Sequence, residues 1–338
     1  MNGQRPGILG TTAAWTLLLA GTAVFVYPLL WMLGVSLSTP ADAQAATVEG
    51  GFVWPSDPQV GNFREALAQI GSDNAAEPLR GFKDALANSV VVAVLVTLGT
   101  VLSSSLVALA FARMRFRGSR PLFLVMLGTM MLPGQVTMIP LFILFRSLGW
   151  VDTILPLVVP AFFGNAYFVF MYRQFIAQVP EALLEAARLD GLGWLGIWWR
   201  IILPLTRPVT AITAVFTFIG CWNDFLAPLI YLQSDEQATL AVALNSFRNQ
   251  YGGVTKVHLL MAASIITMVP CILLFLAAQK QFIEGLGKGA GRGGTAAGRA
   301  GKEPRWHRSS STASPRPTRA ASAPCRRPTS PSGTGSSS

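Results

Sequence analysis

Charged residues are scarce in this chain of 338 residues. Asp, Glu, Lys and Arg together make up only 12% of the sequence, whereas hydrophobic residues make up 51%. A typical soluble domain is about 25% charged. The shortage of charge therefore excludes an ordinary soluble fold and indicates a membrane protein.

Cysteine and histidine are also sparse. The cysteines are Cys221, Cys271 and Cys325, and the histidines are His258 and His307. They form no CxxC pair and no metal-site spacing, so neither a disulfide framework nor a metal centre is predicted. A phosphate-binding G-x-x-x-x-G-K-[ST] loop is absent, and "GLGKGAGRGG" has the wrong spacing for one. No catalytic residue and no cofactor is predicted.

A basic face of the kind that binds nucleic acid is missing too, although the net charge is +10. Eleven of the 26 Lys and Arg residues lie between Lys280 and the C-terminus, and most others fall between apolar runs. No aromatic residues are interleaved with a basic stripe. This distribution is typical of the cytoplasmic loops and tail of a membrane protein, so no nucleic-acid partner is predicted.

Long apolar runs are abundant. A membrane-spanning helix needs about 20 mostly apolar residues. The first run has only Arg5 ahead of it and no small-residue cleavage pattern after it, so a retained helix is predicted instead of a signal peptide. The sequence predicts an all-α membrane protein with six transmembrane helices. They are expected at 13–37, 86–112, 121–146, 153–176, 206–231 and 258–283.

The positions of Lys and Arg predict the orientation, because cytoplasmic loops carry an excess of both. With the N-terminus inside, the inner loops carry Arg113, Arg115, Arg117, Arg120, Arg173, Arg188, Arg200 and Arg207. The outer loops are less basic, and the long one is rich in acids. Both termini are therefore predicted to be cytoplasmic. The domain plan is a cytoplasmic N-terminus at 1–12, a six-helix domain at 13–286 and a tail at 287–338.

The tail and the long outer loop have distinct compositions. Between 287 and 338 there is no Leu, Ile, Val, Met or Phe, so this basic segment is predicted to be disordered. Attraction to anionic lipid headgroups and out-of-frame translation are alternative explanations of the tail. In the outer loop at 38–85, "NFREALAQI" predicts a short surface helix with Asn62 as its N-cap.

Helix breakers interrupt the third predicted span. The stretch "MLPGQVTMIP" (131–140) places Pro133, Gly134 and Pro140 at membrane depth. Broken backbone survives there only where protein or a watery cavity satisfies its polar groups. Two explanations remain open. One is a packing kink, and the other is a break that lines a pathway, with Gln135 and Thr137 offering hydrogen bonds.

A second polar interruption, "CWNDFLAPLIYL" (221–232), lies near the outer end of the fifth predicted span. Asp224 is the only acid inside any predicted span, and intramembrane acids commonly mark function. Its interfacial position favours a structural hydrogen-bonding role over direct solute contact. The candidate translocation path consists of Gln135, Thr137, Asn165, Asn223 and Asp224.

One compact helix with mixed charge is expected in the second inner loop. It begins at Pro180, which suits a first turn, and stops at Gly191, which suits a left-handed C-terminal position. Glu185 and Arg188 are three residues apart and can pair. Asp190 lies where the helix dipole disfavours an acid, and such local conflicts often mark function. An ordinary amphipathic surface helix explains the pattern equally well on physical grounds.

These residues resemble a known signature. "EAA" (185–187), "DG" (190–191) and "ILP" (202–204), followed by Pro208, are similar to the conserved loop of ABC importer permeases. The spacing resembles the sugar-importer type, which includes the inner-membrane maltose permease subunit. The stretches "ARMRFRG" (112–118), "LPGQVTMIPLF" (132–142), "WNDFLAPLI" (222–230) and "QKQFIEGL" (279–286) also resemble this family. Leu192 and Trp194 depart from its usual small and polar residues.

The resemblance implies that the helix at about 180–191 is a cytoplasmic coupling helix that docks on an ATP-binding cassette ATPase subunit. It also implies a second permease subunit in a heterodimer and an extracytoplasmic solute-binding protein. The chain itself would not hydrolyse ATP. The coupling residues implied are Glu185, Ala186, Ala187, Arg188, Asp190 and Gly191.

The expected function is that of a cell-membrane permease for a sugar or similar polar solute. Two alternatives remain at this point. One is an ABC permease for a non-sugar solute such as a polyamine or phosphate. The other is an ion-coupled secondary transporter, although that class usually places several ionisable groups near the midplane. An intramembrane enzyme is more distant still, because no catalytic set is present.

Overall fold

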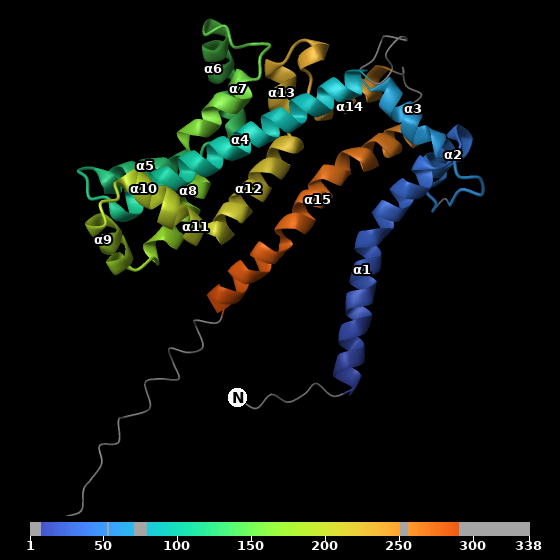
Figure 1. Ribbon diagram of the computed structural model, residues 1–338. Helices are drawn as coiled ribbons and strands as arrows, with labels where there is room; N and C mark the ends of the chain where they lie inside the picture. Colours follow the sequence, from blue (N-terminus) through green and yellow to red (C-terminus); the bar gives the residue numbers. More distant parts are fainter. Residues whose placement is uncertain (1–7, 53, 71–79, 251–255, 291–338) are drawn as a thin grey trace, which may run out of the picture. The chain divides into compact units, whose positions relative to one another are not determined.

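The structure is a computed structural model that describes residues 8–52, 54–70, 80–250 and 256–290. Within these ranges every regular element is a helix, as predicted (Figure 1). The longer helices are α1 (Ile8–Ser36), α4 (Arg80–Arg113), α5 (Ser119–Thr129), α6 (Gly134–Ser147), α8 (Ala166–Ala177), α12 (Arg207–Trp222), α14 (Leu240–Gln250) and α15 (Val257–Ala290). The shorter ones are α2 (Pro40–Glu49), α3 (Gly61–Gln69), α7 (Leu155–Val158), η1 (Val159–Phe163), α9 (Glu181–Leu189), α10 (Trp194–Ile197), η2 (Trp198–Ile202), α11 (Leu203–Leu205), α13 (Leu226–Tyr231) and η3 (Asp235–Gln237).

Four segments are long and apolar enough to cross a membrane, namely Ala14–Ser36, Gly81–Arg113, Leu155–Ala177 and Val257–Gln279. They agree with four of the predicted spans. Two bent helix pairs raise the number to six if each pair is counted as one span. The predicted fifth span is not one continuous helix, because α12 ends at Trp222 and α13 begins only at Leu226. Helix α15 continues to Ala290, beyond the predicted boundary at 286, and the remainder of the predicted tail lies outside the described residues.

The third predicted span is broken and not merely kinked. Helices α5 and α6 meet at an angle of 99°. The break lies just before Pro133, which has no N–H group to continue a helix and which occupies the N-cap position of α6. Pro140, predicted as a further breaker, lies inside α6, and that helix continues to Ser147. One of the two prolines therefore determines the bend.

Helix α4 packs along both α8 and α12, and α15 packs against α12 and α1 (Figure 1). Small residues at these contacts let the helices approach closely, as is common between membrane helices. Ala93 and Ala108 are fully buried in α4. Gly99 lies so close to η1 that an added Cβ atom would be 2.8 Å from the ring of Phe162. One turn further on, the Ser103 hydroxyl donates a hydrogen bond to the carbonyl oxygen of Ala161.

The segment after α1 contains two helices that pack against α15. Helix α2 was not predicted from the sequence; its N-cap Thr39 accepts a hydrogen bond from the backbone N–H of Asp42. The predicted helix α3 is present, but Asn62 is not its N-cap. Asn62 lies in the first turn, is only 7% exposed, and donates hydrogen bonds to the carbonyl oxygens of Ser36 and Ser38. These two hydrogen bonds satisfy the buried amide of Asn62 and tie α3 to the end of α1.

Candidate coupling helix and solute cavities

Helix α9 carries all but the last two of the predicted coupling residues. It begins at Glu181, directly after Pro180. At its end the N–H of Gly191 donates to the carbonyl oxygen of Arg188, and the N–H of Leu192 donates to that of Ala187. This pair of bonds is a Schellman motif, which requires a left-handed residue just beyond the helix. Gly191 has a φ of 81°, so the predicted glycine stop is confirmed.

The inner face of α9 is fixed to the helices beneath it. Leu184 and Ala187 are buried in an apolar cluster with Tyr172 and Ile176 of α8. Arg113, the last residue of α4, donates hydrogen bonds to the carbonyl oxygen of Ile176 at 2.8 Å and to those of Ala177 and Val179. These bonds satisfy the carbonyl groups of Ala177 and Val179 at and just after the end of α8, and they add to the bond that the Val179 N–H donates to the Ile176 carbonyl. Helix α9 is therefore joined to both α8 and α4.

The outer face of α9 is exposed. Glu185, Ala186 and Asp190 all lie on it, together with Leu189, whose side chain is 89% exposed. Among the described residues no ion pair joins Glu185 to Arg188. The Arg188 guanidinium instead lies 4.0 Å from the centre of the Trp194 ring, a cation–π contact that braces the helix end. Leu189 was not predicted from the sequence as part of this surface, although an apolar residue on the polar side of the helix was a usable signal.

The two basic loops predicted to be on the same side of the membrane meet beside α9. A groove of about 630 Å³ is lined by Arg113 and Arg115 from the first loop and by Glu181, Glu185 and Arg188 from the second. Helix α4 is 34 residues long, which corresponds to about 50 Å. Because Arg113 ends α4, this groove lies at the opposite end of α4 from residues 88 and 89.

At that opposite end, loops from distant parts of the chain are fastened together. The Asn88 amide donates to the carbonyl oxygens of Glu236 and Ala238. Asp152, which has a left-handed backbone with a φ of 64°, accepts hydrogen bonds from the backbone N–H and the hydroxyl of Ser234. These hydrogen bonds and one from Gln233 lower the pKa of the Asp152 carboxyl, the Ser234 backbone N–H having the largest effect. The charged carboxylate thus holds the loop after α13.

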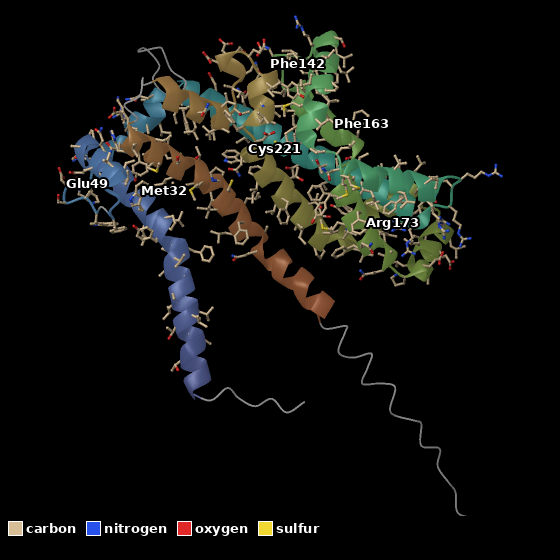
Figure 2. The ribbon with its side chains drawn as sticks, turned by 180° about the vertical axis from the view of Figure 1, so that it is seen from behind. Met32, Glu49, Phe142, Phe163, Arg173 and Cys221 are labelled. Carbon is tan, nitrogen blue, oxygen red and sulfur yellow. The ribbon has the colours of Figure 1, made fainter. Side chains whose placement is uncertain are left out.

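A cavity of about 430 Å³ lies among α4, η1, α8 and α12. This volume is within the range of small-molecule sites, which are mostly apolar with a few placed polar groups. Cys221, labelled on α12 in Figure 2, and the ring of Phe168 belong to its wall. Its polar lining consists of Ser89, Thr100, Asn165, Thr217, Asp224 and Thr239.

Local structure places the two predicted residues of this cavity. The side-chain oxygen of Asn165 accepts hydrogen bonds from the N–H groups of Tyr167 and Phe168 and so caps α8. The Asn165 N–H donates to the Ser104 hydroxyl of α4. Asp224 accepts a bond from the N–H of Ala227 at the start of α13. The structural role predicted for Asp224 is therefore present, and the residue also faces the cavity.

The five predicted path residues do not form one group. A second cavity of about 520 Å³ is lined by Gln135 and Asp224, so Asp224 belongs to both cavities. Thr137 lines neither, and its hydroxyl donates to the carbonyl oxygen of Gly134 within α6. Asn223 faces a third cavity of about 210 Å³ beside α15, and its amide donates to the Ile219 carbonyl. Thr217 and Thr239 were missed, because nothing in sequence spacing brings them together.

Comparison with known proteins agrees with this architecture. The family described as the binding-protein-dependent transport system inner membrane component matches residues 100–287, more than half of the chain. The chain belongs to this family. It is a permease subunit of an ABC importer, a multi-pass inner-membrane protein and a transport component, not an enzyme. Membership decides against the ion-coupled transporter and the intramembrane enzyme as alternatives.

Relatives of the permease carry names of importers for several solutes. It is 36% identical to an arabinooligosaccharides transport system permease of Halalkalibacterium halodurans over 206 residues, 61% of this chain and 73% of that one. It is 30% identical to a melibiose/raffinose/stachyose import permease of Bacillus subtilis over 79% of this chain and 91% of that one. It is 33% identical to an sn-glycerol-3-phosphate transport permease of Yersinia enterocolitica over 65% of this chain and 76% of that one.

The permease fold also matches a solved structure. A chain of a bacterial ABC transporter involved in the import of the acidic polysaccharide alginate superimposes with a TM-score of 0.69. The match covers 83% of this chain and 99% of that one at 22% identity. At this level of identity the similarity supports the fold alone.

Proposed function

We propose that this permease forms part of the path for a sugar or similar polar solute, and that ATP-binding cassette subunits drive it by docking on α9. The observation that carries the proposal is the division of α9 into two faces. Leu184 and Ala187 fix one face to the bundle, and Leu189 leaves an apolar side chain 89% exposed on the other. A single exposed leucine is ordinary on a protein surface, so the support comes from the position of Leu189 on the same exposed face as the signature residues Glu185 and Ala186.

The attachments of α9 suit a coupling element. The buried Leu184 and the carbonyl bonds of Arg113 resist bending between α9, α8 and α4, and the Schellman motif fixes the C-terminal end of α9. A partner that moves α9 would therefore move these helices as a rigid body, and α4 and α8 both line the solute cavity. Alternating access by rigid-body motion of packed helices follows.

The proposed coupling residues are Glu185, Ala186, Ala187, Arg188, Asp190 and Gly191, with Leu189 added. They have different roles, since Ala187 is buried and Arg188 rests on Trp194. Glu185 and Leu189 provide the exposed contacts, Asp190 ends the helix, and Gly191 allows the turn. The proposed location of the ATPase places α9, both termini and residues 1–12 and 287–338 in the cytoplasm.

The proposed complex contains a second permease subunit in a heterodimer, two ATPase subunits and an extracytoplasmic solute-binding protein. The family name itself refers to binding-protein-dependent transport. Sugars are the leading solute class, because named relatives at 36% and 30% identity import oligosaccharides. A phosphate-containing solute is the second candidate, because a relative at 33% identity is named for sn-glycerol-3-phosphate.

Exchange of Glu185 tests the coupling proposal. In the complete transporter reconstituted in liposomes, Glu185→Ala is expected to lower ATP-driven uptake at least about tenfold. Loss of a charged hot spot at an interface commonly weakens binding of the partner by about tenfold or more. Uptake is measured with radiolabelled melibiose, raffinose and sn-glycerol-3-phosphate, and copurification of the ATPase subunit is followed in parallel.

The matched control is Glu236→Ala, the same exchange at an exposed residue of η3 near the opposite end of α4. It should leave both uptake and copurification unchanged. Normal uptake by Glu185→Ala, or an equal loss in both variants, would contradict docking on α9.

A further inference from the structure

Two threonine hydroxyls in the wall of the first cavity lack hydrogen-bond partners. The Oγ1 atoms of Thr217 and Thr239 are buried, and neither makes a hydrogen bond. A hydroxyl inside a helix usually bonds to the carbonyl oxygen one turn earlier, as Thr210 does to Thr206. Buried polar groups without partners are rare, and each requires an explanation. Thr97 Oγ1 is buried without a partner as well, but Thr217 and Thr239 line the cavity. Rotation of their side chains towards the cavity would let a bound ligand with hydroxyl groups supply the missing partners.

Hydrogen bonds with α4 fix the position of Thr239. Asn88 bonds to the carbonyl oxygens on either side of Gln237, and the Ser89 hydroxyl accepts a bond from the N–H of Leu240. Thr239 directly precedes α14, a position from which threonine commonly caps a helix. Its hydroxyl instead makes no hydrogen bond, and the residue lies in the cavity wall with only 5% of its surface exposed.

The charge of the lining restricts the occupant. Asp224 is the only ionisable carboxyl among the described residues that line either of the two cavities it joins, and no Lys, Arg or His accompanies it there. An anion entering either cavity would meet the Asp224 carboxyl with no basic side chain beside it in the described lining, which is electrostatically unfavourable. A neutral polyhydroxy compound can instead donate hydroxyl groups to the carboxylate and use Phe168 as an apolar wall.

We infer that this cavity is a solute subsite of the permease for an uncharged, hydroxyl-rich compound, contacted by Thr217, Thr239, Asn165 and Asp224. The inference rests on the proposed function and refines it, because it places solute contact on this subunit and selects against anionic solutes. Asn165 contributes its amide NH₂, which makes no hydrogen bond to the described residues, while its oxygen caps α8. Donors and acceptors thus converge from α8, α12 and the segment before α14.

Isosteric removal of the hydroxyls tests the subsite in the reconstituted complete transporter. Thr217→Val and Thr239→Val are expected to raise the half-saturating concentration for uptake of melibiose or raffinose about tenfold or more, since each leaves a solute hydroxyl unpaired. Their thermal stability should stay equal or increase, because a buried polar group without a partner is removed. Thr97→Val is the matched control: its Oγ1 is also buried without a partner in α4, but the residue does not line the cavity.

The outcomes separate the inference from the proposed function. If wild type takes up melibiose or raffinose and both cavity variants behave like Thr97→Val, the subsite is refuted and the importer proposal stands. Preference of wild type for sn-glycerol-3-phosphate over both neutral sugars refutes the charge selection alone. Uptake of these compounds that does not depend on ATP refutes the proposed function and the inference with it.

Two native cysteines give a probe of charge that needs no transported solute. Cys221 lines the cavity beside Asp224, whereas Cys271 lines the cavity beside α15, which has no ionisable carboxyl or base among its described lining residues. The experiment uses complete transporters that retain only one of these cysteines. Each is treated with two methanethiosulfonate reagents, a neutral hydroxyethyl one and an anionic sulfonatoethyl one. Both reagents react with the same thiolate, so the ratio of the two reaction rates does not depend on the pKa of the thiol.

The ratio of the neutral to the anionic reaction rate should be at least about tenfold higher at Cys221 than at Cys271, because the nearby Asp224 carboxylate repels the anion and no basic side chain in the described lining offsets it. Asp224→Asn should reduce the ratio at Cys221 towards that at Cys271. Equal ratios at the two cysteines in the wild-type background would overturn the selection against anions.

Discussion

Two residues of α4 position neighbouring segments in opposite ways, Arg113 by hydrogen bonds and Gly99 by the absence of a side chain. The Arg113 guanidinium donates to carbonyl groups at the end of α8 and so fixes the segment that leads to α9. The absence of a side chain at Gly99 lets η1 pass close to α4, and that contact places Asn165 at the cavity.

Gly99→Ala is expected to destabilise the purified permease by about 1–3 kcal/mol, because overpacking a tight contact forces neighbours to move. The new Cβ would be 2.8 Å from two ring atoms of Phe162. Thermal unfolding in detergent measures the effect. Gly128→Ala in α5 is the control, since an added Cβ there meets nothing within 4 Å. Restoration of stability in the double variant Gly99→Ala, Phe162→Ala supports the steric cause, and equal stability of wild type and Gly99→Ala argues against it.

At the scale of elements, the positions that matter are where helices stop. Helix α9 stops at a glycine, α6 starts after a proline, and α12 gives way to α13 around Asp224. The last of these breaks brings Asp224 to two cavities at once. Helix α9 combines its stop with two chemically different faces, and those faces can be tested separately.

The same exchange at two leucines of α9 should have different effects. Leu184→Ala removes a buried side chain and is expected to cost about 2–5 kcal/mol of stability. Leu189→Ala removes an exposed one and should change stability by no more than about 0.5 kcal/mol, yet lower ATP-driven uptake severalfold. Thermal unfolding and uptake are measured on both variants. Full uptake by Leu189→Ala would remove Leu189 from the docking surface.

At the scale of the whole molecule, the long helix α4 separates two differently built ends. Arg113 and Arg115 meet Glu181 and Arg188 at one end, and at the other Asn88 binds the loop at Glu236. The clustering of basic residues at the first end suits a cytoplasmic location.

Accessibility to a membrane-impermeant thiol reagent tests the proposed orientation. In vesicles that contain the permease without ATPase subunits and without native cysteines, Leu189→Cys should react in inside-out vesicles only, and Glu236→Cys in right-side-out vesicles only. Both side chains lie outside the membrane-spanning segments and on exposed residues, so reactivity reports sidedness. Reaction of Leu189→Cys from the outside would reverse the proposed topology.

The sequence by itself determined the helical class, the apolar spans and the stop of α9 at Gly191, because these depend on local properties. Hydrophobic length predicts a span wherever it lies, and a glycine suits a left-handed turn whatever surrounds it. The signature residues around Glu185 likewise required no tertiary information, because their identity and spacing are read directly along the chain.

Only the tertiary structure decided which polar residues share a cavity. Asn165, Thr217 and Thr239 are distant in sequence and meet because α4 holds α8, α12 and the segment before α14 around one space. Asn223 and Asp224 are neighbours in sequence but face different cavities. Likewise, only the structure showed that the 99° break between α5 and α6 lies at Pro133 and that Pro140 is accommodated inside α6. Such choices depend on packing between distant segments, which local sequence patterns do not encode.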